Sequence, residues 1–279
     1  MSAREPTLLT LCNRQLRARP LWQPGDVVLA GVSGGPDSMV LFHALSCLQK
    51  QWGHRVLGLG VDHGLRPEAA DELDRVAAFA ERQGLDFRRL RISVAAGSNL
   101  QARARQARHA ALQETARDVG AAAIALGHTS DDRAETVLLR LLRGSGRKGL
   151  AAMPPKSAGI EGSCPLVRPL LLASRSAVLA HAKRHGVPFS VDPSNSDRRF
   201  LRVRVRQELL PLLQSMAPQI VSQLCDLTAD LEDDDGAGDP FTSLGRAQRQ
   251  QIKGLLRRGS GRTTVRLSGG RDLELRFFR

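Results

Sequence analysis

The sequence predicts an α/β fold: a doubly wound parallel sheet with helices on both faces, followed by a small C-terminal α+β domain. Apolar runs alternate with segments of helical period, and this order favours parallel strands joined by crossover helices. The expected strands are Val27–Val32, Val56–Val61, Phe87–Ile92 and Ala122–Leu126, and the expected helices are Ser38–Gln51, Pro67–Gln83 and Leu100–Val119. We place the domain boundary at residue 213, so that the two domains cover 1–213 and 214–279.

The first predicted strand ends in a turn rich in glycine and hydroxyl groups. Ser33–Ser38 has the sequence Ser-Gly-Gly-Pro-Asp-Ser, and an amphipathic segment follows it. Such a turn lets backbone N–H groups approach phosphate oxygens, and the helix N-terminus adds partial positive charge. The serines and Asp37 can also bind phosphate and help to hold Mg²⁺. No Lys-Ser or Lys-Thr follows, so this is not a Walker A loop; an ordinary strand-to-helix turn is the alternative.

Polar clusters follow three of the predicted strands. They are Ser33–Ser38, Asp62–Arg66 and His128–Glu135. Ligands of open parallel sheets bind beyond the carboxyl ends of the strands, which meet at one edge. The sequence therefore predicts one crevice that receives side chains from all three clusters.

The third cluster begins a helix. Thr129 and Asp132 fit a capping box with Asp in place of the usual Glu. An apolar stripe follows at helical spacing, made of Ala134, Val137, Leu138, Leu141 and Leu142. Asp131 and Asp132 lie four and three residues before Glu135, so these acids beside His128 are suited to a cationic substrate or Mg²⁺. Stabilisation of the helix dipole is the alternative, and it accounts less well for Glu135, one turn further in.

Glycine and proline dominate the next segment. Gly144–Gly149 formally matches GxGxxG, but it follows a helix rather than a strand, so we reject a dinucleotide site and expect a flexible, cationic helix exit. Ala151–Pro165 contains three prolines and two glycines and is predicted to be a loop.

Arginines recur after a turn over Asp192–Asp197. The helix expected after this turn carries Arg198, Arg199, Arg202, Arg204 and Arg206. Arg202 and Arg206 share a face, and Arg199 precedes Arg202 by three residues. Because like charges on one face repel, this row favours a polyanionic partner; a solvated helix face is the alternative.

The end of the chain is predicted to be a separate, small domain. Leu231–Pro240 is acidic and contains glycine, as expected of a linker. One helix is expected over Leu244–Arg257, and short strands are expected over Thr263–Leu267 and Leu273–Phe278. This segment is too small for an independent catalytic core.

The charge balance favours an acidic partner. The 279 residues include 41 Lys and Arg against 28 Asp and Glu, a net charge of +13, which favours nucleic acid over a membrane surface; a generally basic proteome is the alternative. Aromatic residues are only 4% and Tyr is absent, so arginine, histidine and phosphate contacts are expected to outweigh base stacking.

The four cysteines, Cys12, Cys47, Cys164 and Cys225, form no CxxC pair. Their spacing argues against a zinc knuckle or an Fe–S cluster and favours reduced thiols in a cytoplasmic protein. No apolar run reaches the ~18 residues of a membrane span. Arginines near the N-terminus allow a transit peptide, but a first amphipathic helix is the preferred interpretation.

Ser33–Ser38 matches SGGxDS, the PP-loop signature of ATP pyrophosphatases, and from about Val27 to Leu213 the chain resembles the tRNA(Ile)-lysidine synthase family. The motifs that carry the resemblance are Ser33–Ser38, Val61–Arg66, Asn99 to Arg108, His128 with Asp131–Gly144, Arg168–Leu170 and Asp192–Asn195. The chain departs from the family where Thr129 replaces a second His, His109 replaces Tyr, and Val203 interrupts an Arg-Asn-Arg run. These departures concern the tRNA contacts and leave the PP-loop intact.

The resemblance implies an adenine-nucleotide α-hydrolase-like fold and a two-step ligation. ATP would adenylate the C2 oxygen of the wobble cytidine in an isoleucine tRNA with a CAU anticodon, and lysine would then displace AMP. ATP and Mg²⁺ are the implied cofactors, and tRNA and L-lysine are the implied partners, with residues 214–279 contacting tRNA. The resemblance does not determine the oligomeric state, and a homodimer is one of the alternatives.

The resemblance also implies roles for single residues. The catalytic set is Asp37, His128, Asp131, Asp132, Glu135 and Arg202. The nucleotide-binding set is Ser33, Gly34, Gly35, Pro36, Asp37, Ser38, Asp62 and His63, with Asp37 toward the metal. The tRNA-binding set is Arg103, Arg108, Arg199, Arg202, Arg204 and Arg206.

Two alternatives remain beside this interpretation. A tRNA cytidine thiolase normally needs cluster-binding cysteines, which the spacing of the four thiols does not provide. A catalytically silent tRNA-binding protein is disfavoured by the intact Ser33–Ser38 turn together with the acids.

Overall fold

The computed structural model describes residues 6–62, 64, 68–93, 100–157, 163–190, 197–233, 261–266 and 272–277. Its contacts divide the chain into two units, Met1–Ala229 and Asp230–Arg279. Each unit has a sheet of its own, of six and of two strands.

The sheet of the first unit has the strand order β3-β2-β1-β4-β6-β5. Its strands are β1 (Val27–Gly31), β2 (Arg55–Asp62), β3 (Asp86–Arg91), β4 (Ala123–Ala125), β5 (Lys156–Ser157) and β6 (Leu166–Val167). The first four and β6 pair in parallel, and β5 joins β6 antiparallel. The predicted doubly wound parallel sheet is confirmed. The loop predicted over Ala151–Pro165 is corrected, because it contains β5; a strand of two residues is too short for its periodicity to be visible in the sequence.

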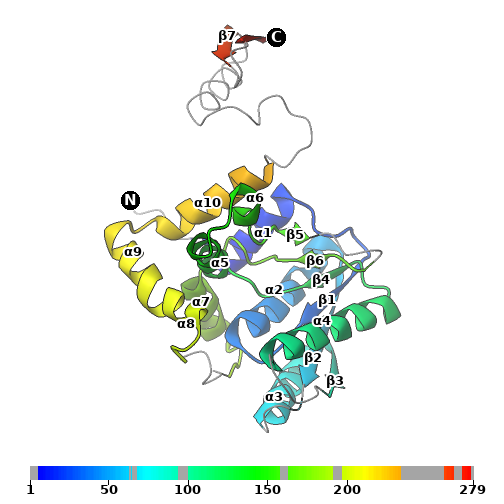
Figure 1. Ribbon diagram of the computed structural model, residues 1–279. Helices are drawn as coiled ribbons and strands as arrows, with labels where there is room; N and C mark the ends of the chain where they lie inside the picture. Colours follow the sequence, from blue (N-terminus) through cyan, green and yellow to red (C-terminus); the bar gives the residue numbers. More distant parts are fainter. Residues whose placement is uncertain are drawn as a thin grey trace. The chain divides into compact units, whose positions relative to one another are not determined.

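Helices cover both faces of this sheet (Figure 1). Alternate side chains of β1 point to opposite faces: Val28 and Ala30 belong to one buried cluster, and Leu29 belongs to another. The first cluster includes α1 (Leu8–Ala18), α2 (Pro36–Trp52), α3 (Glu68–Gln83) and α7 (Arg175–His185), and the second includes α4 (Leu100–Asp118). Burial on both faces explains why the central strands are continuously apolar.

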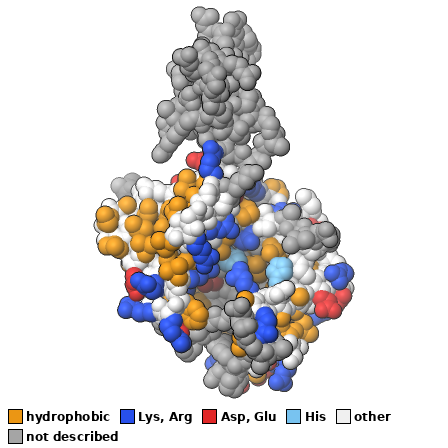
Figure 2. Space-filling view, in the orientation of Figure 1, with side chains coloured by type: hydrophobic (Ala, Val, Ile, Leu, Met, Phe, Trp, Pro, Cys, Tyr) orange, Lys and Arg blue, Asp and Glu red, His pale blue; other side chains and the backbone are white. Residues whose placement is uncertain are grey.

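A third apolar cluster lies among helices that follow the sheet. It joins α5 (Ser130–Leu142), α6 (Arg147–Leu150), a π-helical turn (Val205–Leu209), α9 (Leu210–Met216) and α10 (Ile220–Asp233). Leu224 of α10 is buried in this cluster, and the first unit extends to Ala229; the domain boundary at residue 213 stays a prediction. Figure 2 shows hydrophobic side chains over α9 and α10, where Leu212, Met216 and Leu227 are exposed.

Two predictions for segments near this cluster, one of a helix and one of a linker, need correction. Helix α8 (Leu201–Arg204) begins only at Leu201, so Arg198 and Arg199 lie in the preceding turn rather than on its face. The linker predicted from Leu231 is helical as far as Asp233, because α10 continues to that residue. The rest of the predicted linker and the helix expected over Leu244–Arg257 lie outside the described residues.

The second unit contains an antiparallel hairpin. Its strands β7 (Gly261–Arg266) and β8 (Asp272–Phe277) overlap the two strands predicted there. Among the described helices of the whole chain, none is long and apolar enough to cross a membrane.

Three histidines meet where α2 packs against α7. His43 Nδ1 lies 2.9 Å from His181 Nε2, and the His185 ring lies 4.3 Å from the His181 ring, centroid to centroid. His43 and His181 are buried, and burial followed by the charge of His185 lowers both pKa values, that of His181 to about 4. Across the described residues, no three His, Cys, Asp or Glu side chains are arranged to hold a metal ion.

Candidate active site

A crevice of about 590 Å³ lies at the carboxyl ends of β1, β2 and β4. Its walls come from the Ser33–Ser38 turn, the middle of α4, the start of α5, Arg175 at the start of α7, and the segment from Phe200 to Arg206. Side chains from two of the three predicted polar clusters, Ser33–Ser38 and His128–Glu135, line this crevice. Val61 of β2 lines the wall, but it precedes the Asp62–Arg66 cluster, and neither Asp62 nor Gly64, the described residues of that cluster, lines the crevice.

The Ser33–Ser38 turn is held by its own hydroxyl groups. Ser38 Oγ accepts a hydrogen bond from the Ser33 backbone N–H (3.0 Å), lies 3.1 Å from Ser33 Oγ, and donates to the Gly35 carbonyl (3.0 Å). Gly34 has φ +78°, a left-handed conformation that favours glycine. Helix α2 begins at Pro36, and no side chain caps its N-terminus. The residues of this uncapped helix start, Pro36, Asp37 and Ser38, line the crevice, which is the placement of an anion-binding helix N-terminus.

Asp37 lies in the first turn of α2, against the end of β4. A Cβ at Gly127 would lie 2.7 Å from the Asp37 carbonyl oxygen, so only glycine allows the two backbones to approach this closely. Asp37 Oδ1 is buried and has no hydrogen-bond partner among the described residues, and Oδ2 lies 4.0 Å from an Arg175 guanidinium nitrogen. Burial, and then the charge of Asp132, raises the pKa of Asp37 to about 6. Such a carboxylate is ready to receive a cation or a hydrogen-bond donor.

His128 follows β4 and lines the same crevice. Burial lowers its pKa to about 4, against the opposing effect of the Asp132 charge, so the imidazole is neutral near pH 7. Its Nδ1 is buried without a hydrogen-bond partner in the described part of the chain. A neutral ring can donate one hydrogen bond and accept another, which suits polarisation of a substrate oxygen.

Two acids of α5 are paired with two arginines. Arg202 donates to Glu135 Oε2 (2.9 Å) and Asp132 Oδ1 (2.8 Å). Arg206 donates to Glu135 Oε1 (2.5 Å) and Oε2 (3.0 Å) and lies 3.3 Å from Asp132 Oδ1. The Glu135 side chain is only 1% exposed. We call these four residues the ion cluster.

Asp132 serves the helix start as well as the ion cluster. The predicted capping box is confirmed: Thr129 Oγ1 accepts from the Asp132 N–H, and Asp132 Oδ2 accepts from the Thr129 N–H (3.0 Å). Burial alone would raise the pKa of Asp132, but the Thr129 N–H and the charges of Arg202, His128 and Arg206 lower it overall. Asp132 is therefore ionised near neutral pH.

Asp131 has hydrogen-bond partners outside the ion cluster. Its Oδ2 accepts from the Arg175 backbone N–H (2.8 Å) and from Ser130 Oγ (3.4 Å), and it thereby stabilises the start of α7. The structure brings Asp132 and Glu135 together but does not bring Asp131 to them.

The other predicted site residues are dispersed. Arg108 lines the crevice, whereas Arg103 does not. Asp62 accepts from the Gly64 N–H at the end of β2 (2.8 Å), and His63 lies outside the described residues. Arg199 pairs with Asp197 (2.7 Å) and Arg204 with Glu208 (3.3 Å), both at the exposed surface.

The crevice residues that were not predicted as site residues include Arg105, Arg175 and Phe200. Arg105 is one helical turn before His109 and three residues before Arg108, so helical spacing from Arg108 was a usable signal. Arg175 reaches the crevice because of how α7 packs in the fold, and no local sequence pattern predicts that packing. Figure 2 shows Lys and Arg side chains gathered in the middle of this face, with His side chains among them.

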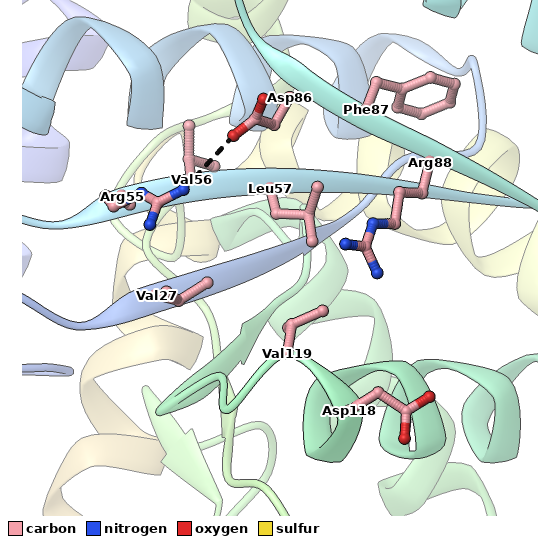
Figure 3. A pocket seen from close by; sticks show the side chains of 9 residues that line it. All are labelled: Val27, Arg55, Val56, Leu57, Asp86, Phe87, Arg88, Asp118 and Val119. Atoms are coloured by element: carbon pink, nitrogen blue, oxygen red, sulfur yellow. Dashed lines mark ion pairs between the residues drawn. The ribbon is translucent and has the colours of Figure 1, made fainter.

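A second cavity, of about 440 Å³, lies at the opposite, amino ends of the strands. Figure 3 shows Leu57 and Val119 on its apolar floor, with Arg88 and Asp118 nearby and Arg55 paired with Asp86 (3.7 Å) at its edge. None of the predicted site residues lines it. In open parallel sheets ligands bind at the carboxyl ends of the strands, so this cavity lies at the opposite edge from the expected site.

The chain is similar to known proteins over most of its length. The family model of the PP-loop domain matches residues 9–213. A protein of Thermobifida fusca named tRNA(Ile)-lysidine synthase is 40% identical over 247 residues, which cover 88% of this chain and 73% of that protein. The chain belongs to the tRNA(Ile)-lysidine synthase family. A tRNA(Ile)-lysidine synthase of Novosphingobium aromaticivorans is 41% identical over 224 residues, covering 77% of this chain and 68% of that protein.

Solved structures extend the likeness beyond the tRNA(Ile)-lysidine synthase family. A U34-tRNA thiolase of Methanococcus maripaludis, solved with its [4Fe-4S] cluster, superposes with a TM-score of 0.68. It is 19% identical and covers 81% of this chain and 79% of that chain, so it supports the PP-loop fold alone. In this chain the four cysteines are free, and Cys12, a residue of α1, is buried.

Proposed function

We propose that this protein ligates lysine to C2 of the wobble cytidine in an isoleucine tRNA with a CAU anticodon, at the expense of ATP. In the first step the cytidine C2 oxygen attacks the α-phosphorus, and pyrophosphate leaves. In the second step the lysine amine attacks C2, AMP leaves with the C2 oxygen, and the amine loses a proton. The observation that carries the proposal is that one crevice joins the Ser33–Ser38 turn to the ion cluster.

The turn and the start of α2 would hold the nucleotide phosphates. The free N–H groups of the α2 N-terminus and the hydroxyls of Ser33 and Ser38 supply donors of fixed direction. Donors that are in place before the reaction stabilise the charge that develops as pyrophosphate leaves. Arg175, at the start of α7, adds positive charge on the same wall.

Asp37 fits a Mg²⁺ ligand. Its Oδ1 is buried without a partner among the described residues, and one carboxylate together with phosphate oxygens and water is a usual Mg²⁺ set. When bound, Mg²⁺ would neutralise charge on the phosphates. Because burial raises the pKa of Asp37 to about 6, the carboxylate is available for this role above that pH.

Asp132 and Glu135 would receive the lysine ammonium, and one of them would take its proton. Both acids are buried near neutral His128, which would hydrogen-bond the cytidine C2 oxygen. Asp131 has a structural partner in the Arg175 N–H, which favours the other two acids for this step.

The tRNA would approach over the basic face. Arg105 and Arg108 line the crevice, and Arg199 and Arg204 stand at the surface beyond it. The C-terminal unit, which ends in the β7–β8 hairpin, would contact the body of the tRNA. Phosphate contacts of this kind make binding depend on salt.

The test is direct identification of the product. The protein is incubated with ATP, labelled lysine and a CAU-anticodon isoleucine tRNA, and the RNA is digested to nucleosides. Label in a modified cytidine, with one pyrophosphate per lysine, is the expected result. A transcript with U34 in place of C34 serves as the matched control. In a parallel reaction with sulfide in place of lysine, a thiolated cytidine would favour the thiolase. Absence of an ATP-dependent product in both reactions would favour a silent binder.

A further inference from the structure

The acids assigned to lysine are already occupied. Asp132 and Glu135 together carry two negative charges, and Arg202 and Arg206 compensate both. The four side chains are joined by hydrogen bonds of 2.5 to 3.3 Å. The ion cluster is therefore neutral and satisfied as it stands.

Lysine cannot join this cluster without displacing a guanidinium group. A third cation beside two carboxylates would leave one positive charge uncompensated in a site where Glu135 is almost completely buried. Uncompensated buried charge is costly, on the scale of several kcal/mol. The arginines must move before the ammonium binds.

Both arginines lie where nucleotide phosphates would bind. Arg202 and Arg206 line the same crevice as Ser33, Gly35 and Ser38. A guanidinium group pairs with phosphate oxygens as it does with a carboxylate, through two parallel hydrogen bonds. Phosphates therefore offer the arginines an alternative partner, and this differential affinity is what a ligand needs to shift a conformational equilibrium.

The segment that carries the arginines has an element suited to movement. Arg206 lies in the π-helical turn Val205–Leu209, between α8 and α9. Such turns are rare and are frequently found at functional sites. The side chains of Arg202 and Arg206 remain partly exposed, at 37% and 25%, so they can turn toward the crevice without leaving a buried core.

We propose that Arg202 and Arg206 are a gate on the lysine site, opened by the phosphates of the nucleotide. With the crevice empty, the arginines hold Asp132 and Glu135. When a triphosphate binds, the guanidinium groups turn to its oxygens, and the freed carboxylates accept the ammonium. This proposal rests on the proposed function and adds an order to it: nucleotide first, lysine second. Because coupling is reciprocal, lysine raises the affinity for the nucleotide by the same factor.

Calorimetric titration with lysine tests the gate in the wild-type protein. The titration is made with the protein alone, and then with the α,β-methylene analogue of ATP, with pyrophosphate, or with adenosine. The analogue and pyrophosphate should tighten lysine binding by about 5- to 150-fold, the usual range of coupling between sites. Adenosine, which lacks phosphate, should leave it unchanged. If adenosine tightens binding as much as the analogue, phosphate is not the trigger and the gate is refuted.

The variant Arg206→Gln should separate lysine binding from the nucleotide. One guanidinium group is then missing, so lysine should bind without the analogue, and the ratio of the two affinities should fall toward one. Arg88→Gln, in the cavity at the amino ends of the strands, is the matched control and should keep the wild-type ratio.

The wild-type titrations decide the question even if Arg206→Gln does not fold. Equal lysine affinity with and without the analogue would overturn the gate and leave the proposed function in place. If lysine binds under none of these conditions and no lysidine is formed, both proposals fail.

Discussion

Replacement of Glu135 by Gln tests the ion cluster at its most buried point. The carboxylate accepts from Arg202 and from Arg206, the latter through both oxygens. An amide of the same shape keeps one oxygen but turns two hydrogens toward guanidinium donors and removes the negative charge. Breaking a fully buried ion pair costs about 3–5 kcal/mol.

The expected cost is smaller here, about 2 kcal/mol, because both arginines are partly exposed and Asp132 still faces them. At about 2–4 °C per kcal/mol for a chain of this size, the melting temperature should fall by about 4–8 °C. In turnover, tRNA-dependent pyrophosphate release should persist, whereas the KM for lysine should rise roughly 10-fold or more, the value of a hydrogen bond to a charged group.

Two assays on one protein preparation measure these effects: thermal unfolding by circular dichroism, and parallel detection of pyrophosphate and of lysidine. Glu114→Gln, an exposed Glu on α4, is the matched control and should match the wild type in both assays. Glu135→Gln with unchanged melting temperature and unchanged lysine kinetics would refute both the energetic account of the ion cluster and the assignment of Glu135 to lysine.

Three further predictions follow from named contacts. Asp37→Ala should reduce tRNA-dependent pyrophosphate formation by ~10²-fold or more, the scale of one lost transition-state group; a folded variant with a normal rate would contradict the assignment. Changing both Arg105 and Arg108 to Gln should reduce the slope of log affinity for tRNA against log salt by about 1.5, at about 0.7–0.9 per phosphate contact, and an unchanged slope would return them to solvated surface. Stability should decrease as pH falls from 6.5 toward 4, because the unfolded chain protonates His43 and His181 near 6.5, whereas the pKa of His181 in the folded chain is about 4. His181→Gln should flatten that dependence in thermal unfolding measured across this pH range, and a slope equal to that of the wild type would show that other groups cause it.

The sequence predicted those features of the fold that are determined by interactions between residues close together in the chain. The strands β1, β2 and β4 follow from their apolar runs, and the start of α5 follows from the Thr129–Asp132 capping box, whose partners are three residues apart. The Ser33–Ser38 turn is likewise formed by hydrogen bonds within five residues. The interactions that form each of these features therefore lie within a short stretch of sequence.

Partners far apart in the chain were beyond such patterns. Glu135 and Arg202 are separated by 67 positions, and Asp131 and the Arg175 N–H by 44. Composition suggested that the arginine row faces RNA, but tertiary packing turns Arg202 and Arg206 onto acids of the same chain. The π-helical turn was not predicted from the sequence, because a register change of one residue leaves the spacing of the apolar residues almost unaltered.

The two oxygens of Asp132 have consequences for how this protein can change. Oδ2 begins a helix through Thr129, and Oδ1 faces Arg202 and Arg206. Stabilising substitutions are common in proteins, and many of them leave activity unchanged. A substitution at position 132 disturbs both the helix start and the ion cluster, because each depends on one oxygen of this carboxylate. Evolution and engineering can alter this position only together with Thr129 or with the arginines, so its tolerance must be measured in combined variants rather than single ones.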